Sequence, residues 1–306
     1  MPTVAFTVDL DPTPAYYAIH GLQWNGGADP IFQSGLKRLI DLLKEEGIPA
    51  TLFVTGGTLG PAEWALLRDA AAAGCELADH SFSHDYRLSL RPQEDIVTDL
   101  KRNSFALREN TGTAPRGFRA PGYNTSPAML AALREMGYRY DSSLFPSPFY
   151  HSAKQMLIWL KRLMGKRSVS FVGSFRDAFG PQEPFTPGTA VHTAGTEPGL
   201  VELPITTLFP PVGLPLIGTA LITFPAPLVH LMVSQALKRD FAVIEMHAID
   251  FAETADGIEL RPLSDRQPDL AHGIDRKLKR IRRTIQRFKE RGFTFETLGA
   301  IADRHA

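Results

Sequence analysis

The chain of 306 residues has 33 Lys and Arg against 33 Asp and Glu, and therefore carries no net charge. The lack of a basic excess argues against a nucleic-acid-binding protein, and the hydrophobic share of 43% is typical of a soluble globular protein. A single cysteine, Cys75, excludes an intrachain disulfide and a cysteine-based zinc site. The first residues lack the basic and apolar regions of a signal peptide, which predicts a cytoplasmic protein.

Apolar runs and helical patterns alternate along the first half of the chain. Helices are predicted from Leu36 to Gly47 and over 61–73, 92–109 and 126–137. Strands are predicted at 4–8, 50–54, 76–80, 117–119 and 138–141. Short connections between such elements predict a parallel sheet covered by helices. Their repetition favours a barrel over an open sheet, and a barrel of this length forms one domain, here 1–306.

This alternation is interrupted between residues 147 and 240, which we interpret as an insertion before the last strands. A helix that is both apolar and basic is predicted over 153–166. Residues 203–237 contain no Asp, Glu, Lys or Arg, but repeated prolines argue against a helix that spans a membrane. The two segments either frame an apolar groove for lipid or pack into the core. Strands at 200–203, 241–246 and 293–296, and helices over 271–291 and at the C-terminus, complete the pattern.

Polar residues stand at the ends of the predicted strands. Catalytic groups of a parallel barrel gather at the carboxyl ends of its strands. The candidates by this criterion are Asp9, Asp11, His80, His84, Arg119, Asp141 and His247.

Two pairs among these residues are typical of a metal site. Asp9 and Asp11 lie two apart and point the same way from a strand, so their carboxylates repel unless a metal or a proton stabilises them. His80 and His84 lie four apart directly after a strand, a spacing that suits zinc or a related divalent ion. The alternative for the aspartates is turn formation at Pro12. The alternative for the histidines is a chance repeat.

Two further residues have simpler alternatives. Arg119 precedes Ala-Pro-Gly, which would hold the guanidinium rigidly beside a sharp turn, although a surface salt bridge is an alternative. His247 ends an apolar strand, where a titrating imidazole would face the barrel mouth. A buried structural histidine is the alternative.

Five segments that contain these residues resemble, in the same order along the chain, the motifs of the polysaccharide deacetylase superfamily, also called the NodB-homology domain. The matching segments are TVDLD (7–11), HSFSH (80–84), RAPG (119–122), DSS (141–143) and EMH (245–247). HSFSH and RAPG are the specific matches, and DSS is the loosest. The commonest first motif of the family has adjacent aspartates, whereas Leu10 separates them here, as in some members that this chain resembles more closely.

The resemblance implies a distorted (β/α) barrel of the NodB-homology type. It implies a divalent metal, zinc above all, bound by Asp11, His80 and His84. Asp9 would then be the general base. If the spaced first motif is not a variant of the common one, the roles of Asp9 and Asp11 exchange.

The resemblance also assigns the remaining candidates. His247 would be the general acid and Arg119 would orient the base. The backbone N–H of Gly122 would donate to the oxyanion, and Asp141 would tune His247.

The implied reaction is hydrolysis of an N-acyl group, acetyl or formyl, from a sugar or a lipid-linked aminosugar. A lipid-linked substrate would bring the protein into peripheral contact with the inner membrane face. One alternative is an amidase that acts on a non-sugar amide or ureide, as in allantoinase-like relatives. The other is a non-catalytic module that binds carbohydrate or lipid. A binding module has no need of both an acid and a base, so the full motif set favours an enzyme.

Overall fold

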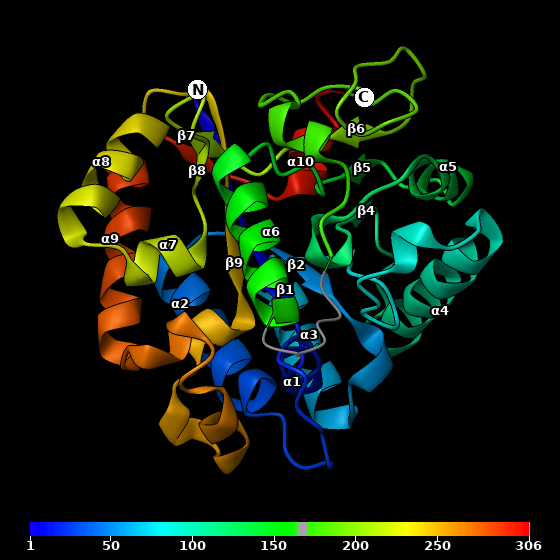
Figure 1. The fold of residues 1–306 in the computed structure, drawn as a ribbon. Coiled ribbons are helices and arrows are strands. Elements are labelled where there is room, and N and C mark those ends of the chain that lie inside the picture. Colours follow the sequence, from blue (N-terminus) through cyan, green and yellow to red (C-terminus); the bar gives the residue numbers. More distant parts are fainter. Residues whose placement is uncertain (164–170, 306) are drawn as a thin grey trace.

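The computed structural model describes residues 1–163 and 171–305, in which helices surround a parallel sheet (Figure 1). The strands of this sheet are β1 (Thr3–Leu10), β2 (Thr51–Val54), β3 (Glu76–Asp79), β4 (Gly117–Phe118), β5 (Tyr140–Asp141), β6 (Val201–Glu202), β9 (Phe241–His247) and β10 (Thr294–Phe295). A separate antiparallel hairpin contains β7 (Thr207–Leu208) and β8 (Leu214–Pro215). The helices are α1 (Thr13–Ile19), α2 (Lys37–Glu46), α3 (Pro61–Ala72), α4 (Gln93–Thr111), α5 (Pro127–Glu135), α6 (Pro148–Leu163), α7 (Gly218–Thr223), α8 (Ala226–Ala236), α9 (Ile274–Glu290) and α10 (Leu298–Ala302).

The sheet has the strand order β10-β1-β2-β3-β4-β5-β6, and β9 pairs with the other side of β1. Between β6 and β9, the Thr206 N–H donates to the Val243 carbonyl at 3.3 Å, and the Leu216 N–H donates to the Thr206 carbonyl at 2.9 Å. The Glu245 N–H in turn donates to the Leu216 carbonyl at 3.2 Å. These single bonds close the sheet irregularly, so the predicted distorted (β/α) barrel is confirmed.

Strand β1 pairs with three other strands of the barrel, β2, β9 and β10. From Val4 onward it is buried on both faces, as expected of a parallel strand covered by helices. Its register sets Asp9 opposite His247 of β9 on one side and opposite Phe53 of β2 on the other. The carboxyl ends of β1, β2 and β9 therefore lie at one end of the barrel.

Local sequence signals explain where several helices begin and end. Helix α2 ends at Gly47, which has a φ of +61° that favours glycine. Helix α5 begins after Ser126, whose hydroxyl accepts the Met129 N–H at 3.1 Å, and Pro127 occupies its first turn. In the view of Figure 1, α2, α7, α8 and α9 cover one side of the sheet, α4 and α5 cover the other, and α6 crosses the front.

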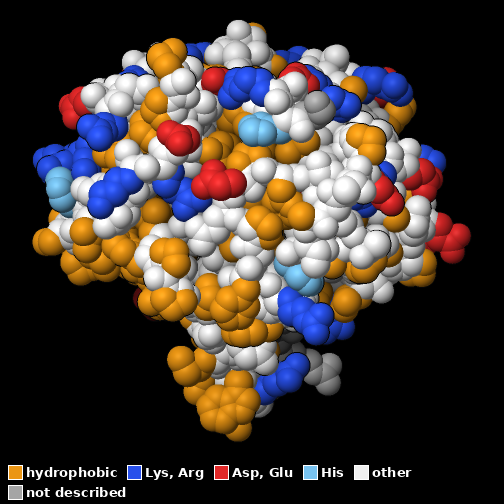
Figure 2. Space-filling model, turned by 90° about the horizontal axis from the view of Figure 1, so that it is seen from above, with side chains coloured by type: hydrophobic (Ala, Val, Ile, Leu, Met, Phe, Trp, Pro, Cys, Tyr) orange, Lys and Arg blue, Asp and Glu red, His pale blue; other side chains and the backbone are white. Residues whose placement is uncertain are grey.

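The interrupted segment differs most from expectation. Helix α6 begins at Pro148, five residues before the predicted start, and residues 164–166 of that prediction lie outside the described residues. The apolar stretch 203–237 forms the β7–β8 hairpin, α7 and α8, and prolines stand in the turn and before α8. Among the described residues, no helix is both long and apolar enough to cross a membrane. Figure 2 shows that apolar side chains gather on a projection at the lower edge of that view, which is the front of Figure 1.

Candidate active site

The strand ends open into a pocket of about 510 Å³. Of the predicted site residues, Asp9, Asp11, His80, Gly122 and His247 line this pocket. Its remaining lining residues are Tyr16, Ile19, Tyr86, Tyr123, Phe145, Tyr150, Ala153, Lys154, Leu157, Ile217, Thr219, Ile249, Gln267, Pro268 and Asp269.

Asp11, His80 and His84 converge at one point beside the pocket. The Oδ1 atom of Asp11 lies 2.8 Å from His84 Nε2 and 3.2 Å from His80 Nε2, and all three residues are buried. The His80 Nδ1 atom lies 2.7 Å from the Arg119 carbonyl oxygen, an acceptor that fixes Nδ1 as the protonated nitrogen and leaves Nε2 with a free lone pair. His84 is positioned by its backbone N–H, which donates to the Ser81 hydroxyl at 2.9 Å.

These three residues fit a divalent cation. Asp11 Oδ1 and both ring nitrogens of His84 are buried, yet none of them makes an aligned hydrogen bond with a described residue, even though Oδ1 and Nε2 lie 2.8 Å apart. Burial opposes ionisation of Asp11, but the His84 and His80 rings lower the pKa of its carboxyl well below the ordinary value. A carboxylate and two imidazole nitrogens that leave further positions open are a ligand set of catalytic zinc sites.

Asp9 is held by Arg119, as predicted. The Arg119 Nη1 donates to Asp9 Oδ1 at 2.7 Å and to the Thr7 hydroxyl at 3.0 Å. The other side of the guanidinium donates to the carbonyl and the hydroxyl of Ser142, each at 2.9 Å, and the group lies 4.1 Å from the ring centroid of Phe53. Arg119 is fully buried, so Asp9 Oδ1 is fixed while Oδ2 is directed to within 3.9 Å of His80 Nε2.

His247 faces Asp11 across the pocket and is held from behind by Glu245. The His247 Nδ1 lies 3.0 Å from Glu245 Oε1, which also accepts the Tyr123 hydroxyl at 3.1 Å, and His247 Nε2 lies 3.8 Å from Asp11 Oδ2. Burial alone would lower the pKa of the His247 imidazole, but the carboxylates of Glu245 and Asp11 outweigh it and raise this pKa to about 10. Burial raises the pKa of Glu245 to about 7. This geometry keeps a proton on His247.

Asp141 lies behind Arg119, away from the pocket. Its carboxylate accepts the Ser143 hydroxyl at 2.5 Å and pairs with Glu202, and burial raises the pKa of Asp141 to about 6. The carboxylate in contact with His247 is therefore that of Glu245, and Asp141 does not occupy the position expected of a group that tunes this histidine.

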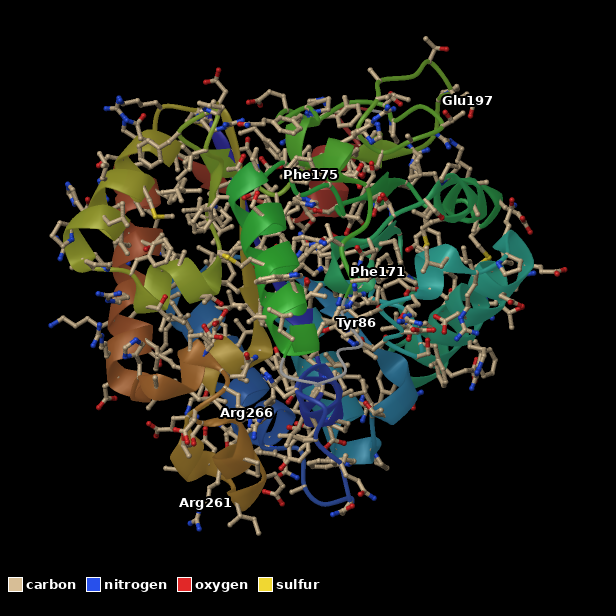
Figure 3. All side chains as sticks on the ribbon, in the orientation of Figure 1. Tyr86, Phe171, Phe175, Glu197, Arg261 and Arg266 are labelled. Atoms are coloured by element: carbon tan, nitrogen blue, oxygen red, sulfur yellow. The ribbon has the colours of Figure 1, made fainter. Side chains whose placement is uncertain are left out.

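Gly122 brings the backbone into the pocket. It has a φ of +63°, and a Cβ at this position would lie 2.6 Å from the Tyr86 ring. The Gly122 carbonyl accepts Lys154 Nζ at 3.1 Å. Burial lowers the pKa of Lys154 to about 8. In Figure 3, Tyr86 lies beside the lower end of α6, and Phe171 and Phe175 follow along the side of this helix.

Three further residues of the site, Glu245, Tyr123 and Lys154, were not predicted from the sequence. Glu245 could have been found, because it stands two residues before His247 in a strand and so points the same way. Tyr123 and Lys154 reach the pocket through tertiary packing that no sequence spacing indicates.

The first half of the chain is similar to a family of known proteins. Residues 2–140 match the family model for polysaccharide deacetylases. The match covers somewhat less than half of the chain, and this part is therefore similar to the polysaccharide deacetylase family. The chain is 27% identical over 154 residues to a peptidoglycan deacetylase of Helicobacter pylori, which covers 48% of this chain and 50% of that protein. It is 30% identical over 156 residues to a peptidoglycan deacetylase-like protein of Gibberella zeae, which covers 45% of each. The chain thus matches about half the length of these relatives.

Solved structures support the same fold over nearly the whole chain. A protein from Mycobacterium smegmatis, provisionally named a polysaccharide deacetylase, aligns with a TM-score of 0.56 at 20% identity and covers 99% of this chain and 89% of its own. A Bacillus anthracis protein described as a CE4 family pseudoenzyme aligns with a TM-score of 0.51 at 11% identity, over 99% of this chain and 66% of its own. At these identities the likeness concerns the fold alone.

Proposed function

We propose that this protein is a metal-dependent hydrolase that removes an acetyl or formyl group from the nitrogen of an aminosugar. The observation that carries the proposal is the pocket itself, where a buried ligand set, a fixed carboxylate and a protonated imidazole meet. The names of the matched relatives, which include peptidoglycan and chitin deacetylases, support an N-acetylated sugar as the substrate class.

The residues of the pocket have separate roles in the proposed reaction. A divalent cation held by Asp11, His80 and His84 would polarise the amide carbonyl and acidify a water molecule. Asp9, fixed on one oxygen by Arg119, accepts the proton of the attacking water on its other oxygen.

Collapse of the intermediate needs a donor for the oxyanion and a proton for the leaving nitrogen. The Gly122 N–H would donate to the oxyanion. His247, held by Glu245, delivers its proton to the leaving nitrogen, because an amine leaves poorly unless it is protonated. The products are the free amine and acetate or formate.

The proposed metal is zinc and the proposed substrates include lipid-linked aminosugars. Two nitrogen ligands and one oxygen ligand favour zinc. Leu157 from the outer helix α6 and Ile217 from the apolar stretch give one wall of the pocket an apolar character. Aromatic rings of Tyr86, Tyr123 and Tyr150 offer flat surfaces for a sugar ring.

The test is release of acetate or formate by the zinc-loaded protein from N-acetyl and N-formyl aminosugars, compared with ureides and cyclic imides. We expect turnover of the sugars, and Asp9→Asn should keep the metal but lose ~10²–10⁴-fold in turnover. Turnover of the ureides alone would identify an amidase of another class. If Asp9→Asn loses metal and Asp11→Asn keeps it, the two aspartates have exchanged roles.

A further inference from the structure

The outward face of α6 is apolar, contrary to the usual pattern of a surface helix. Met156, Trp159 and Leu163 are 61%, 56% and 64% exposed. The exposed apolar residues of this helix are Phe149, Met156, Leu157, Trp159, Leu160 and Leu163. We call this set the α6 apolar face. In Figure 2, apolar side chains cover the projection at the front of the molecule, where α6 lies in Figure 1.

Helix α6 is amphipathic, but its apolar stripe faces outward. Phe149, Met156, Leu160 and Leu163 are spaced so that they form one stripe along an α-helix. His151 and Ile158 lie on the opposite side and are buried. A surface helix normally turns its polar side to water, so the α6 apolar face needs a non-aqueous contact.

The charged residues of the segment that contains α6 have one sign. Every charged residue between Asp141 and Asp177 is Lys or Arg, and the described cations Arg162 and Arg176 are exposed. The apolar surface continues onto Phe175, which is 51% exposed and beside α6. An exposed helix with Trp, Leu and Met in the centre and a basic rim is complementary to an anionic bilayer surface. A symmetric contact between two copies through this face would bring like charges together.

We propose that the α6 apolar face and Phe175 dock on an anionic phospholipid bilayer. Apolar side chains enter the headgroup and acyl boundary, and the exposed cations Arg162 and Arg176 contact lipid phosphates. Ala153, Lys154 and Leu157 of the same helix line the catalytic pocket, so docking sets the pocket beside the headgroup layer. Access to a membrane-bound N-acylated substrate rests on the proposed function, whereas docking itself does not.

The test is co-sedimentation of the full chain with vesicles of phosphatidylcholine alone and of an equal mixture with phosphatidylglycerol. We expect binding to the anionic vesicles that weakens as salt is added. The variant Met156→Gln/Trp159→Gln/Leu163→Gln should lower the partition coefficient roughly 100-fold, since each residue contributes apolar area to the contact. These side chains do not line the catalytic pocket, so turnover of a soluble substrate should stay unchanged.

The matched control is Phe105→Gln/Ile258→Gln, which removes apolar side chains that are 58% and 69% exposed away from α6. This variant should bind as the wild type does. Brominated lipid should quench wild-type tryptophan emission, and Trp159→Phe should abolish the quenching. Absence of wild-type sedimentation, equal binding to neutral and anionic vesicles, or equal loss in the control variant would each overturn the proposal. Because sedimentation is independent of turnover, its failure is distinguishable from failure of the proposed hydrolase.

Discussion

Removal of the proposed proton donor should separate amide substrates from activated esters. The change is His247→Ala, and the comparison is between an N-acetyl aminosugar and an aryl acetate. An amine leaves poorly without a proton, whereas a phenolate leaves readily. We therefore expect His247→Ala to lose far more turnover on the amide than on the ester.

The structure sets the size of this effect. General acid catalysis contributes ~10²–10⁴-fold. The His247 side chain is 25% exposed, so water can enter the vacated space and replace part of the proton donation. We therefore expect a loss of roughly 10²–10³-fold on the amide and less than about 10-fold on the ester. Without the His247 charge, the pKa of buried Glu245, already about 7, rises further, so little buried charge is left unpaired.

The assay is acetate release for the amide and phenolate absorbance for the ester, with the metal content measured in each variant. A matched control is His192→Ala, which removes a partly buried histidine paired with Asp177 at 2.6 Å outside the pocket. That control should keep turnover on both substrates. Equal losses by His247→Ala on the amide and the ester would refute its role as general acid, as would loss of metal.

Three further predictions concern backbone, charge and thiol. Gly122→Ala should slow turnover, because its Cβ would lie 2.6 Å from the Tyr86 ring. The control Gly137→Ala has a φ of +73° and no atom within 4 Å of the added Cβ, so it should keep turnover and lose only ~1–2 kcal/mol of stability in thermal unfolding through backbone strain. Equal turnover in both variants would contradict this. Burial raises the pKa of Glu202 well above its ordinary value, so its contribution to stability is present at low pH and is lost as the pH rises towards the folded-state pKa. Glu202→Gln should reduce that loss by at least ~1 kcal/mol between pH 5 and 8 in urea unfolding, and an unchanged difference would oppose the account. Burial raises the pKa of Cys75 to about 11, so a disulfide reagent at pH 8 should modify the folded protein slowly and the unfolded protein at once; rapid modification of both would contradict its burial.

Much of the first half of the fold could be predicted because several strands are short runs that follow a helix-ending glycine. Gly47 and Gly137 stand where helices α2 and α5 end, and the strands follow directly. The stretch 203–237 could not be resolved in this way. Its apolar residues have neither a helical nor an alternating period, since parts of it form a hairpin and parts form short helices.

The site was predictable where its residues follow strands and not where packing brings them in. Asp11 follows β1 and His80 follows β3, which is separated from β1 only by β2, so the parallel order brings both residues to the same end of the barrel, where they approach to 3.2 Å. Asp141 is the last residue of strand β5, which is further round the barrel, and its carboxylate meets Glu202 of β6 instead. Lys154 enters the pocket from the inserted helix α6, whose placement depends on contacts distant in sequence.

The central claim is that Asp11, His80 and His84 bind a metal on which hydrolysis depends. The most direct measurement is a titration of chelator-treated protein with Zn²⁺, in which bound metal and acetate release from an N-acetyl aminosugar are followed together. The account predicts that turnover is absent before the titration, rises with the metal, and reaches its plateau at one ion per chain, and that His84→Ala neither binds nor turns over. Full metal occupancy in His84→Ala, or undiminished turnover by the metal-free wild type, would contradict it.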